Sequence, residues 1–114
     1  MKPEQAYLRH ILDEIDFLLA EVATVSFEHF LSNETLTRAC ARSLEVIGEA
    51  SKNVPDGFKQ LHPEVDWRRL TGMRDKIIHH YFGVNWEIVW DVVMNRLPEL
   101  KAQVTALLDA ETSK

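Results

Sequence analysis

The apolar residues recur at every third or fourth position along most of the chain, which is the pattern of one face of an α-helix. The first such stretch covers residues 3–22 and begins with Pro3, a residue that suits the first turn of a helix. Its apolar stripe consists of Leu8, Ile11, Leu12, Ile15, Leu18, Leu19 and Val22. No segment alternates apolar and polar residues as a strand would, and there is no internal repeat. The sequence therefore predicts an all-α fold, an antiparallel bundle of four to five helices.

A second long helix is expected from Ser32 or Asn33, either of which can cap its N-terminus, to about Lys52. Gly48 lies inside this helix, where glycine costs ~1 kcal/mol relative to alanine. A close crossing with another helix would explain a glycine here, and so would a contact with a second copy of the chain.

The last helix is expected to begin at Asn85, which can cap it, and to carry an apolar face to about residue 108. Pro98 lies within this segment. Proline has no backbone N–H to donate and its ring clashes with the preceding turn, so we expect a kink or a break near Leu97.

The 114 residues, with a mass of 13.2 kDa, predict a single domain spanning 1–114. Cys40 is the sole cysteine, which excludes an intramolecular disulfide, and its place on an apolar face predicts a small buried side chain. No apolar run approaches the ~20 residues that a membrane span needs. The first residues, with Pro3 and Glu4, lack the pattern of a signal peptide, so a cytoplasmic protein is expected.

The formal net charge of -5 argues against a broad basic surface for nucleic acids. A local basic patch is compatible with that charge, and two copies in a dimer would double it. Six basic residues cluster in the middle of the chain: Lys52, Lys59, Arg68, Arg69, Arg74 and Lys76.

Most of the reactive side chains fall within residues 72–84, where Arg74, His79, His80 and Tyr81 lie within eight positions, and the spacing of apolar residues predicts a helix over 70–82. Arginine can bind phosphate oxygens and the charge that develops on them, and a neutral histidine can exchange a proton at neutral pH. Tyrosine can stack on a base or donate to a phosphate. RNA supplies its own nucleophile, the 2′-hydroxyl, so these residue types can cleave RNA without a metal.

Helical geometry leaves two questions open. His79 falls about 140° from Arg74 on an ideal helix, so either the helix loosens or a second subunit completes the site. The spacing does not choose between His79 and His80. In a purely structural interpretation the histidines favour the C-terminal helix dipole, and Arg74 pairs with Glu45 or Glu49 of another helix.

Two further alternatives concern the same residues. Arg42, Glu45 and Glu49 lie within helical reach of one another, which favours a charge network inside their own helix over an orienting contact to Arg74. Asp75 and His79 lie four apart on one face, but two ligands are too few for a dedicated metal site. We therefore expect neither a metal nor a cofactor.

The segment from Arg74 to Tyr81 fits the Arg-x4–6-His motif of the HEPN superfamily, and in the form Arg-x4-His-x-Tyr it resembles the HepT toxin family, also called DUF86. The likeness extends over nearly the whole chain, roughly from residue 9 to residue 108. Three more blocks resemble that family in the same order: 38–52 as its second helix, 62–67 as the approach to the motif, and 82–84 with 89–90 as its exit.

The resemblance implies a HEPN-like helical domain that forms a homodimer and acts as the toxin of a type VII toxin–antitoxin pair. It would be a metal-independent endoribonuclease with Arg74 and His79 as catalytic residues and His80 as the alternative catalytic histidine. Tyr81, His80 and Lys76 would contact the RNA substrate. A cognate minimal nucleotidyltransferase would be the antitoxin and would add AMP to Tyr81. The added anion would exclude RNA from a phosphate-binding cleft by charge and by bulk. The alternative is a non-catalytic nucleotide-binding or partner subunit of a nucleotidyltransferase.

Overall fold

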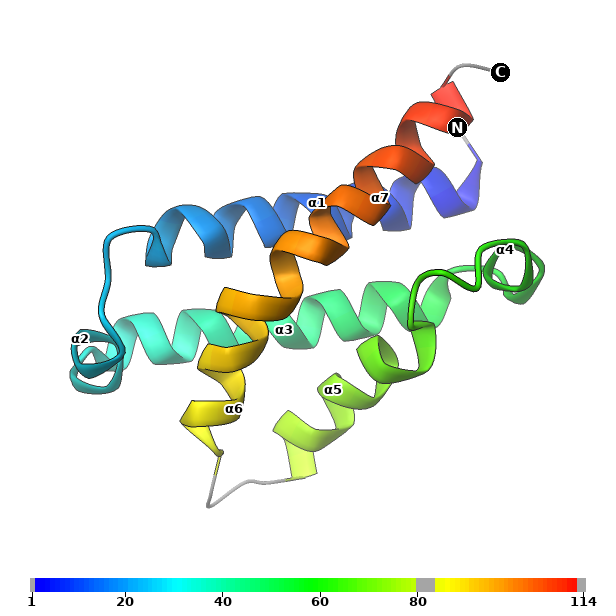
Figure 1. Cartoon of the computed structure of the whole chain (residues 1–114). Helices are drawn as coiled ribbons and strands as arrows, with labels where there is room; N and C mark the ends of the chain where they lie inside the picture. Colours follow the sequence, from blue (N-terminus) through cyan, green and yellow to red (C-terminus); the bar gives the residue numbers. More distant parts are fainter. Residues whose placement is uncertain (1, 80–83, 113–114) are drawn as a thin grey trace.

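A computed structural model describes residues 2–79 and 84–112, and within these residues the chain is helical with no strand. The described residues form four long helical segments with two short helices between them, arranged as in Figure 1. The long segments are α1 (Pro3–Val22), α3 (Glu34–Asn53), α5 (Trp67–His79) and the continuous run of α6 (Trp86–Asp91), η1 (Val92–Arg96) and α7 (Leu97–Thr112). The short helices are α2 (Phe27–Ser32) and α4 (Asp56–Leu61). The predicted all-α antiparallel bundle is confirmed.

Local capping explains where two of the long segments begin. The side-chain Oδ1 of Asn33 accepts the backbone N–H of Leu36 at 3.0 Å and starts α3. The Oδ1 of Asn85 accepts the N–H groups of Glu87 and Ile88, at 3.1 and 3.2 Å, and starts α6. Each such cap contributes about 1 kcal/mol to helix stability. Both caps were expected from the sequence, with Asn33 rather than Ser32 in the first case.

The core lies where α1 packs on α3 and on α7, the two helices that run antiparallel to it in Figure 1. Its centre is aliphatic, and each side chain buried there contributes about 1.5–3 kcal/mol. The fully buried residues include Leu8, Ile11, Ile15, Leu18, Leu44, Ile47, Leu97 and Val104. Cys40 is also fully buried, as its position on the apolar face predicted.

The crossing of α3 and α5 depends on Gly48. A Cβ atom at Gly48 would lie 2.6 Å from the Cβ of Arg74 and 3.1 Å from the carbonyl oxygen of Leu70. Carbon atoms in good contact are about 3.5–4.0 Å apart, so only glycine fits here without moving α5. Of the two explanations that the sequence allowed for Gly48, the structure shows the close helix crossing.

The kink or break expected near Leu97 takes the form of a π-helical turn. In η1 the chain makes one wider turn, and the N–H of Leu97 donates to the carbonyl of Val92. Pro98 follows as the second residue of α7 and cannot donate to the preceding turn. The wider turn accommodates that loss, so α6 and α7 form one bent rod in Figure 1 instead of two separate helices.

Aromatic side chains hold the beginnings of α5 and α6 in place. The ring of Phe30, fully buried in α2, lies 5.0 Å from the ring of Trp90 and 6.0 Å from that of Trp86, measured between centroids. At the start of α5, the indole Nε1–H of Trp67 donates to the carbonyl of His62 at 2.9 Å. The ring contacts hold α6 against α2, and the indole hydrogen bond ties the beginning of α5 to the connection that precedes it.

Of the helices that the structure describes, none combines the length and the apolar composition required to cross a bilayer.

Candidate functional site

Arg74 lies midway along α5, directly over Gly48 of α3. Its Nε forms an ion pair with Oε2 of Glu49 at 2.9 Å, and its Nη1 lies 3.7 Å from Oδ1 of Asp75. The Arg74 side chain keeps 32% of its surface exposed. The Nε edge of the guanidinium is thus held by Glu49. Within the described residues its terminal nitrogens form no ion pair shorter than the 3.7 Å contact with Asp75, so they can donate to an anion.

Glu49 is itself held in place. Asn53 of the same helix donates its side-chain N–H to the Glu49 carbonyl at 2.9 Å and to Glu49 Oε1 at 3.4 Å. The ion pair with Arg74 uses the other carboxylate oxygen. A chain of contacts therefore runs from the end of α3 to the guanidinium on α5.

The network expected inside α3 exists only in part. Arg42 Nη1 pairs with Glu45 Oε2 at 3.3 Å, three residues apart on the same helix. Glu49 does not join that network and pairs instead with Arg74 of α5. For Glu49 the intrahelical interpretation was wrong, because the close crossing at Gly48 brings α5 within reach of its carboxylate.

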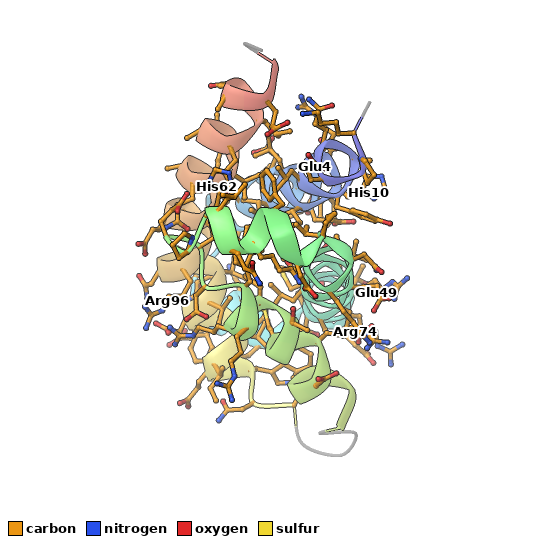
Figure 2. The ribbon with its side chains drawn as sticks, turned by 90° about the vertical axis from the view of Figure 1, so that its right-hand side faces the viewer. Glu4, His10, Glu49, His62, Arg74 and Arg96 are labelled. Atoms are coloured by element: carbon orange, nitrogen blue, oxygen red, sulfur yellow. The ribbon has the colours of Figure 1, made fainter. Side chains whose placement is uncertain are left out.

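Arg74 borders a hollow of about 350 Å³ between α1, α3 and α5. In Figure 2 His10, Glu49 and Arg74 lie along the same side of the molecule. Such a volume falls at the lower end of small-ligand sites. The polar residues that line it are Tyr7, His10, Arg42, Glu45, Glu49, Asn53 and Arg74.

The sequence did not assign Tyr7 and His10 to this site. The two residues are three apart and share a face of α1, beside its apolar stripe. Two polar aromatic residues on one helix face were the sequence feature that could have suggested a role in the site. Nothing local indicated that this face of α1 would lie next to Arg74, more than 60 residues later in the chain.

The other predicted site residues follow Arg74 at the end of α5. Lys76 and His79 belong to its last turns, and their side chains, together with His80 and Tyr81, lie outside the described residues. The backbone is α-helical through His79, so the helix does not loosen between Arg74 and His79. These two positions keep a rise of roughly 7.5 Å and a separation of about 140° around the helix axis.

The described residues bear on two other chemistries, metal coordination and catalysis by a thiol. No three histidine, cysteine, aspartate or glutamate residues in that part of the chain are grouped so that they could hold a metal ion. Burial, with a smaller contribution from the charge of Glu21, raises the pKa of the Cys40 thiol to about 11. A thiol with that pKa is protonated at neutral pH and is a poor nucleophile.

Comparison with known proteins places these residues in a family. The model of the family described as "Ribonuclease HepT-like" matches residues 11–107. A protein of Caldanaerobacter subterraneus subsp. tengcongensis named "Putative RNase TTE0752" is 50% identical over 111 residues, which is 97% of this chain and 99% of the relative. A protein of Thermococcus cleftensis named "Probable ribonuclease HepT" is 44% identical over 101 residues, 89% of this chain and 92% of the relative. No solved structure gives a significant match. The family model covers almost the whole helical bundle, including Arg74 and its crossing with α3. The chain therefore belongs to the ribonuclease HepT-like family.

Proposed function

We propose that this protein is a metal-independent endoribonuclease and the toxin of a type VII toxin–antitoxin pair. The observation that carries the proposal is the Arg74 guanidinium, anchored to Glu49 at 2.9 Å and open toward a hollow, in a chain of the ribonuclease HepT-like family. Arg74 also opens the Arg-x4-His-x-Tyr sequence. A guanidinium that is anchored through Nε and partly exposed suits a scissile phosphate, since it needs little reorganisation as charge develops.

The proposed reaction uses the 2′-hydroxyl of RNA as the nucleophile. Its oxygen forms a bond to the adjacent phosphorus while the bond from phosphorus to the 5′-oxygen breaks, which leaves a 2′,3′-cyclic phosphate and a 5′-hydroxyl. The 2′-hydroxyl loses its proton and the departing 5′-oxygen gains one; His79 carries out one of these two transfers and solvent water the other, while Arg74 binds the nonbridging oxygens. Lys76, His80 and Tyr81 would contact the RNA around this phosphate.

We further propose that the active unit is a homodimer in which each site combines Arg74 of one subunit with His79 of its partner. The support is the regular helix between the two residues, which separates them by about 140° around α5. A second α5 related by a two-fold axis can present its own His79 to the Arg74 of the first.

The first test is cleavage of labelled RNA by the purified protein in the presence of a chelator. Wild type is expected to cut, and Arg74→Ala to lose roughly 10²–10³-fold in rate, as when one charge-stabilising donor is removed. Arg38→Ala is a matched control, because Arg38 is an exposed arginine of α3 that pairs with Glu34. Intact RNA with wild type, together with tight nucleotide binding, would instead favour a non-catalytic nucleotide-binding or partner subunit.

The dimeric arrangement is tested by mixing inactive variants. If each site takes Arg74 and His79 from different subunits, a heterodimer of Arg74→Ala and His79→Ala contains one intact site and recovers activity. If each subunit supplies both residues, both sites of that heterodimer are damaged and the mixture stays inactive.

The proposed antitoxin is a minimal nucleotidyltransferase that adds AMP to Tyr81 and so blocks the site with a bulky anion. Incubation with that enzyme and ATP should add the mass of one AMP group to wild type, and the group should map to Tyr81. Tyr81→Phe should stay unmodified. Modification at another residue would contradict this assignment without affecting the ribonuclease proposal.

A further inference from the structure

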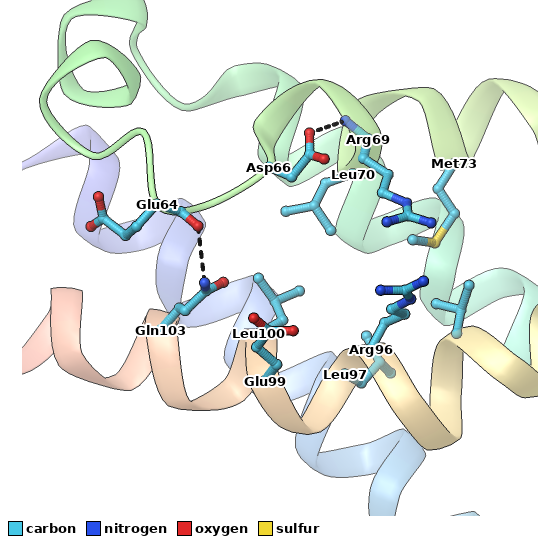
Figure 3. A pocket seen from close by; sticks show the side chains of 11 residues that line it. Glu64, Asp66, Arg69, Leu70, Met73, Arg96, Leu97, Glu99, Leu100 and Gln103 are labelled. Carbon is cyan, nitrogen blue, oxygen red and sulfur yellow. Dashed lines mark hydrogen bonds between the residues drawn. The ribbon is translucent and has the colours of Figure 1, made fainter.

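A second hollow, of about 250 Å³, lies between α5, η1 and α7 (Figure 3). Figure 2 places Arg96, at this hollow, and Arg74 on opposite flanks of α5. The floor of this second hollow is apolar, formed by the buried side chains of Leu70 and Leu97 with Met73 beside them. The hollow is therefore distinct from the one that Arg74 borders.

Two guanidinium groups converge at one end of this hollow. Figure 3 shows the side chains of Arg69, from α5, and Arg96, from η1, pointing toward each other. Neither side chain forms an ion pair within the part of the chain that the structure describes. Asp66 lies close by, but its Oδ1 accepts the backbone N–H of Arg69, at 3.0 Å. Two like charges that face each other, with neither of them in an ion pair to a nearby carboxylate of the described residues, favour an anion between them.

The helical path of the last segment brings Arg96 to this position. Arg96 is the last residue of the π-helical turn η1, immediately before Leu97 of the floor. A π-turn adds a residue to the turn and so changes the direction in which its side chains leave the helix. Such turns inside α-helices occur frequently at functional sites.

The rest of the hollow limits what the anion can belong to. Carboxylates of Glu64 and Glu99 lie along it away from the facing guanidinium groups, and they would repel a ligand that carries several negative charges. These oxygens can accept hydrogen bonds from the amino group of a base or from a 2′-hydroxyl. The chemistry fits one phosphate next to an apolar ring with donors at its edge, and it disfavours an acidic peptide.

We propose that this hollow binds one unpaired nucleotide of a single-stranded RNA, with its phosphate between Arg69 and Arg96 and its base on the apolar floor. The proposal rests on the proposed function, in which RNA is the substrate. It adds a second contact to that function, on the flank of α5 away from Arg74. A strand held at both places crosses the exposed surface of α5.

The test is the binding of a fluorescent single-stranded RNA, measured by anisotropy. The oligonucleotide is 2′-O-methylated, so that it carries the phosphates but has no nucleophile and cannot be cut. Arg69→Gln and Arg96→Gln are each expected to weaken binding roughly tenfold, the loss of a charge-assisted hydrogen bond. Because both would hold the same phosphate, the double variant should lose little more than either single one. Arg68→Gln is the control: it removes the same charge from the adjacent position of α5, outside this hollow.

Three results would overturn the proposal. The first is unchanged affinity in both variants, and the second is an equal loss in Arg68→Gln, which would indicate diffuse electrostatic attraction. The third is tight binding of free 5′-AMP that depends on Arg69 and Arg96 while RNA binding does not, because the hollow would then take mononucleotides. Thermal unfolding of each variant checks that the fold is unchanged, as expected for two exposed side chains.

Binding and cleavage are measured separately, so the two proposals can fail independently. A protein that binds RNA through Arg69 and Arg96 but leaves unmodified RNA intact refutes only the ribonuclease proposal. A protein that cuts RNA, with the same RNA affinity in wild type and in both variants, refutes only the second site.

Discussion

Replacing Gly48 by alanine tests whether the contact between α3 and α5 positions Arg74. The added Cβ would lie 2.6 Å from the Cβ of Arg74, and 3.1 Å both from its backbone nitrogen and from the carbonyl oxygen of Leu70. These atoms belong to the backbone or to its first side-chain carbon, so they cannot rotate away and α5 must move. Overpacking of this kind costs about 1–3 kcal/mol. Alanine regains ~1 kcal/mol of helix propensity, so the net loss of stability is expected between about 0 and 2 kcal/mol.

Gly72→Ala provides the matched control, because the same substitution there should have the opposite sign. Gly72 is also inside a helix, α5, but a Cβ at that position meets no atom within 4 Å. Only the higher helix propensity of alanine over glycine applies, and the free energy of unfolding should rise by roughly 0.5–1 kcal/mol.

Urea unfolding of the two variants and wild type measures both effects, and RNA cleavage measures the consequence for the site. Gly48→Ala should cut RNA more slowly than wild type, since a displaced α5 disturbs the 2.9 Å contact between Arg74 and Glu49. If Gly48→Ala were stabilised as much as Gly72→Ala, and cleaved RNA at the wild-type rate, the close crossing would not matter for this site and the reasoning would be refuted.

Further predictions concern other parts of the same structure. Glu49→Gln should lower kcat for RNA cleavage, because Arg74 loses its anchor. The affinity for RNA should stay equal or improve, because the substitution removes a negative charge. The loss of folding stability should stay below about 1 kcal/mol, since the Arg74–Glu49 pair is partly exposed. Kinetics and unfolding curves check both parts. The Cys40 thiol stays protonated in the folded state up to its pKa of about 11, whereas in the unfolded chain it ionises near 9.0. Stability should therefore fall as the pH rises from about 9 to 11, by up to about 2–3 kcal/mol, and Cys40→Ala should flatten that slope in pH-dependent unfolding. Phe30→Ala should cost about 3–5 kcal/mol, because the fully buried ring joins α2 to both tryptophans of α6; thermal unfolding would show it, and a loss under 1 kcal/mol would contradict that role.

The parts of the fold that follow from local rules could be predicted from the sequence. Asn33 and Asn85 cap helices through side-chain contacts to N–H groups two or three residues away, and apolar stripes repeat within single helices. Gly48 predicted a close neighbour because glycine in a helix interior needs a reason. None of these inferences required knowing which helix packs against which.

The site required that knowledge. Helical spacing allowed Arg74 to pair with either Glu45 or Glu49, and only the position of the crossing at Gly48 decides for Glu49. Pro98 predicted a disturbance near Leu97, but a lost hydrogen bond can be met by a break, a kink or a wider turn, and the sequence did not choose the wider turn that the structure has. Arg69 belonged to the basic cluster of the sequence, whereas Arg96 did not, since the two residues meet only through the tertiary fold.

The overall charge constrains how such a protein can hold RNA. With a formal net charge of -5 there is little long-range attraction, so binding must come from short-range contacts to guanidinium groups. In the proposed binding mode, each subunit holds one phosphate through Arg74 and a second through Arg69 together with Arg96. For single strands each neutralised phosphate contributes about 0.7 to the slope of log affinity against log salt, so two give a slope near -1.4 per subunit. A much steeper slope would mean that RNA follows a broader basic surface than these arginines provide. A slope half as large would leave Arg74 as the sole phosphate contact and remove the need for a strand to cross α5.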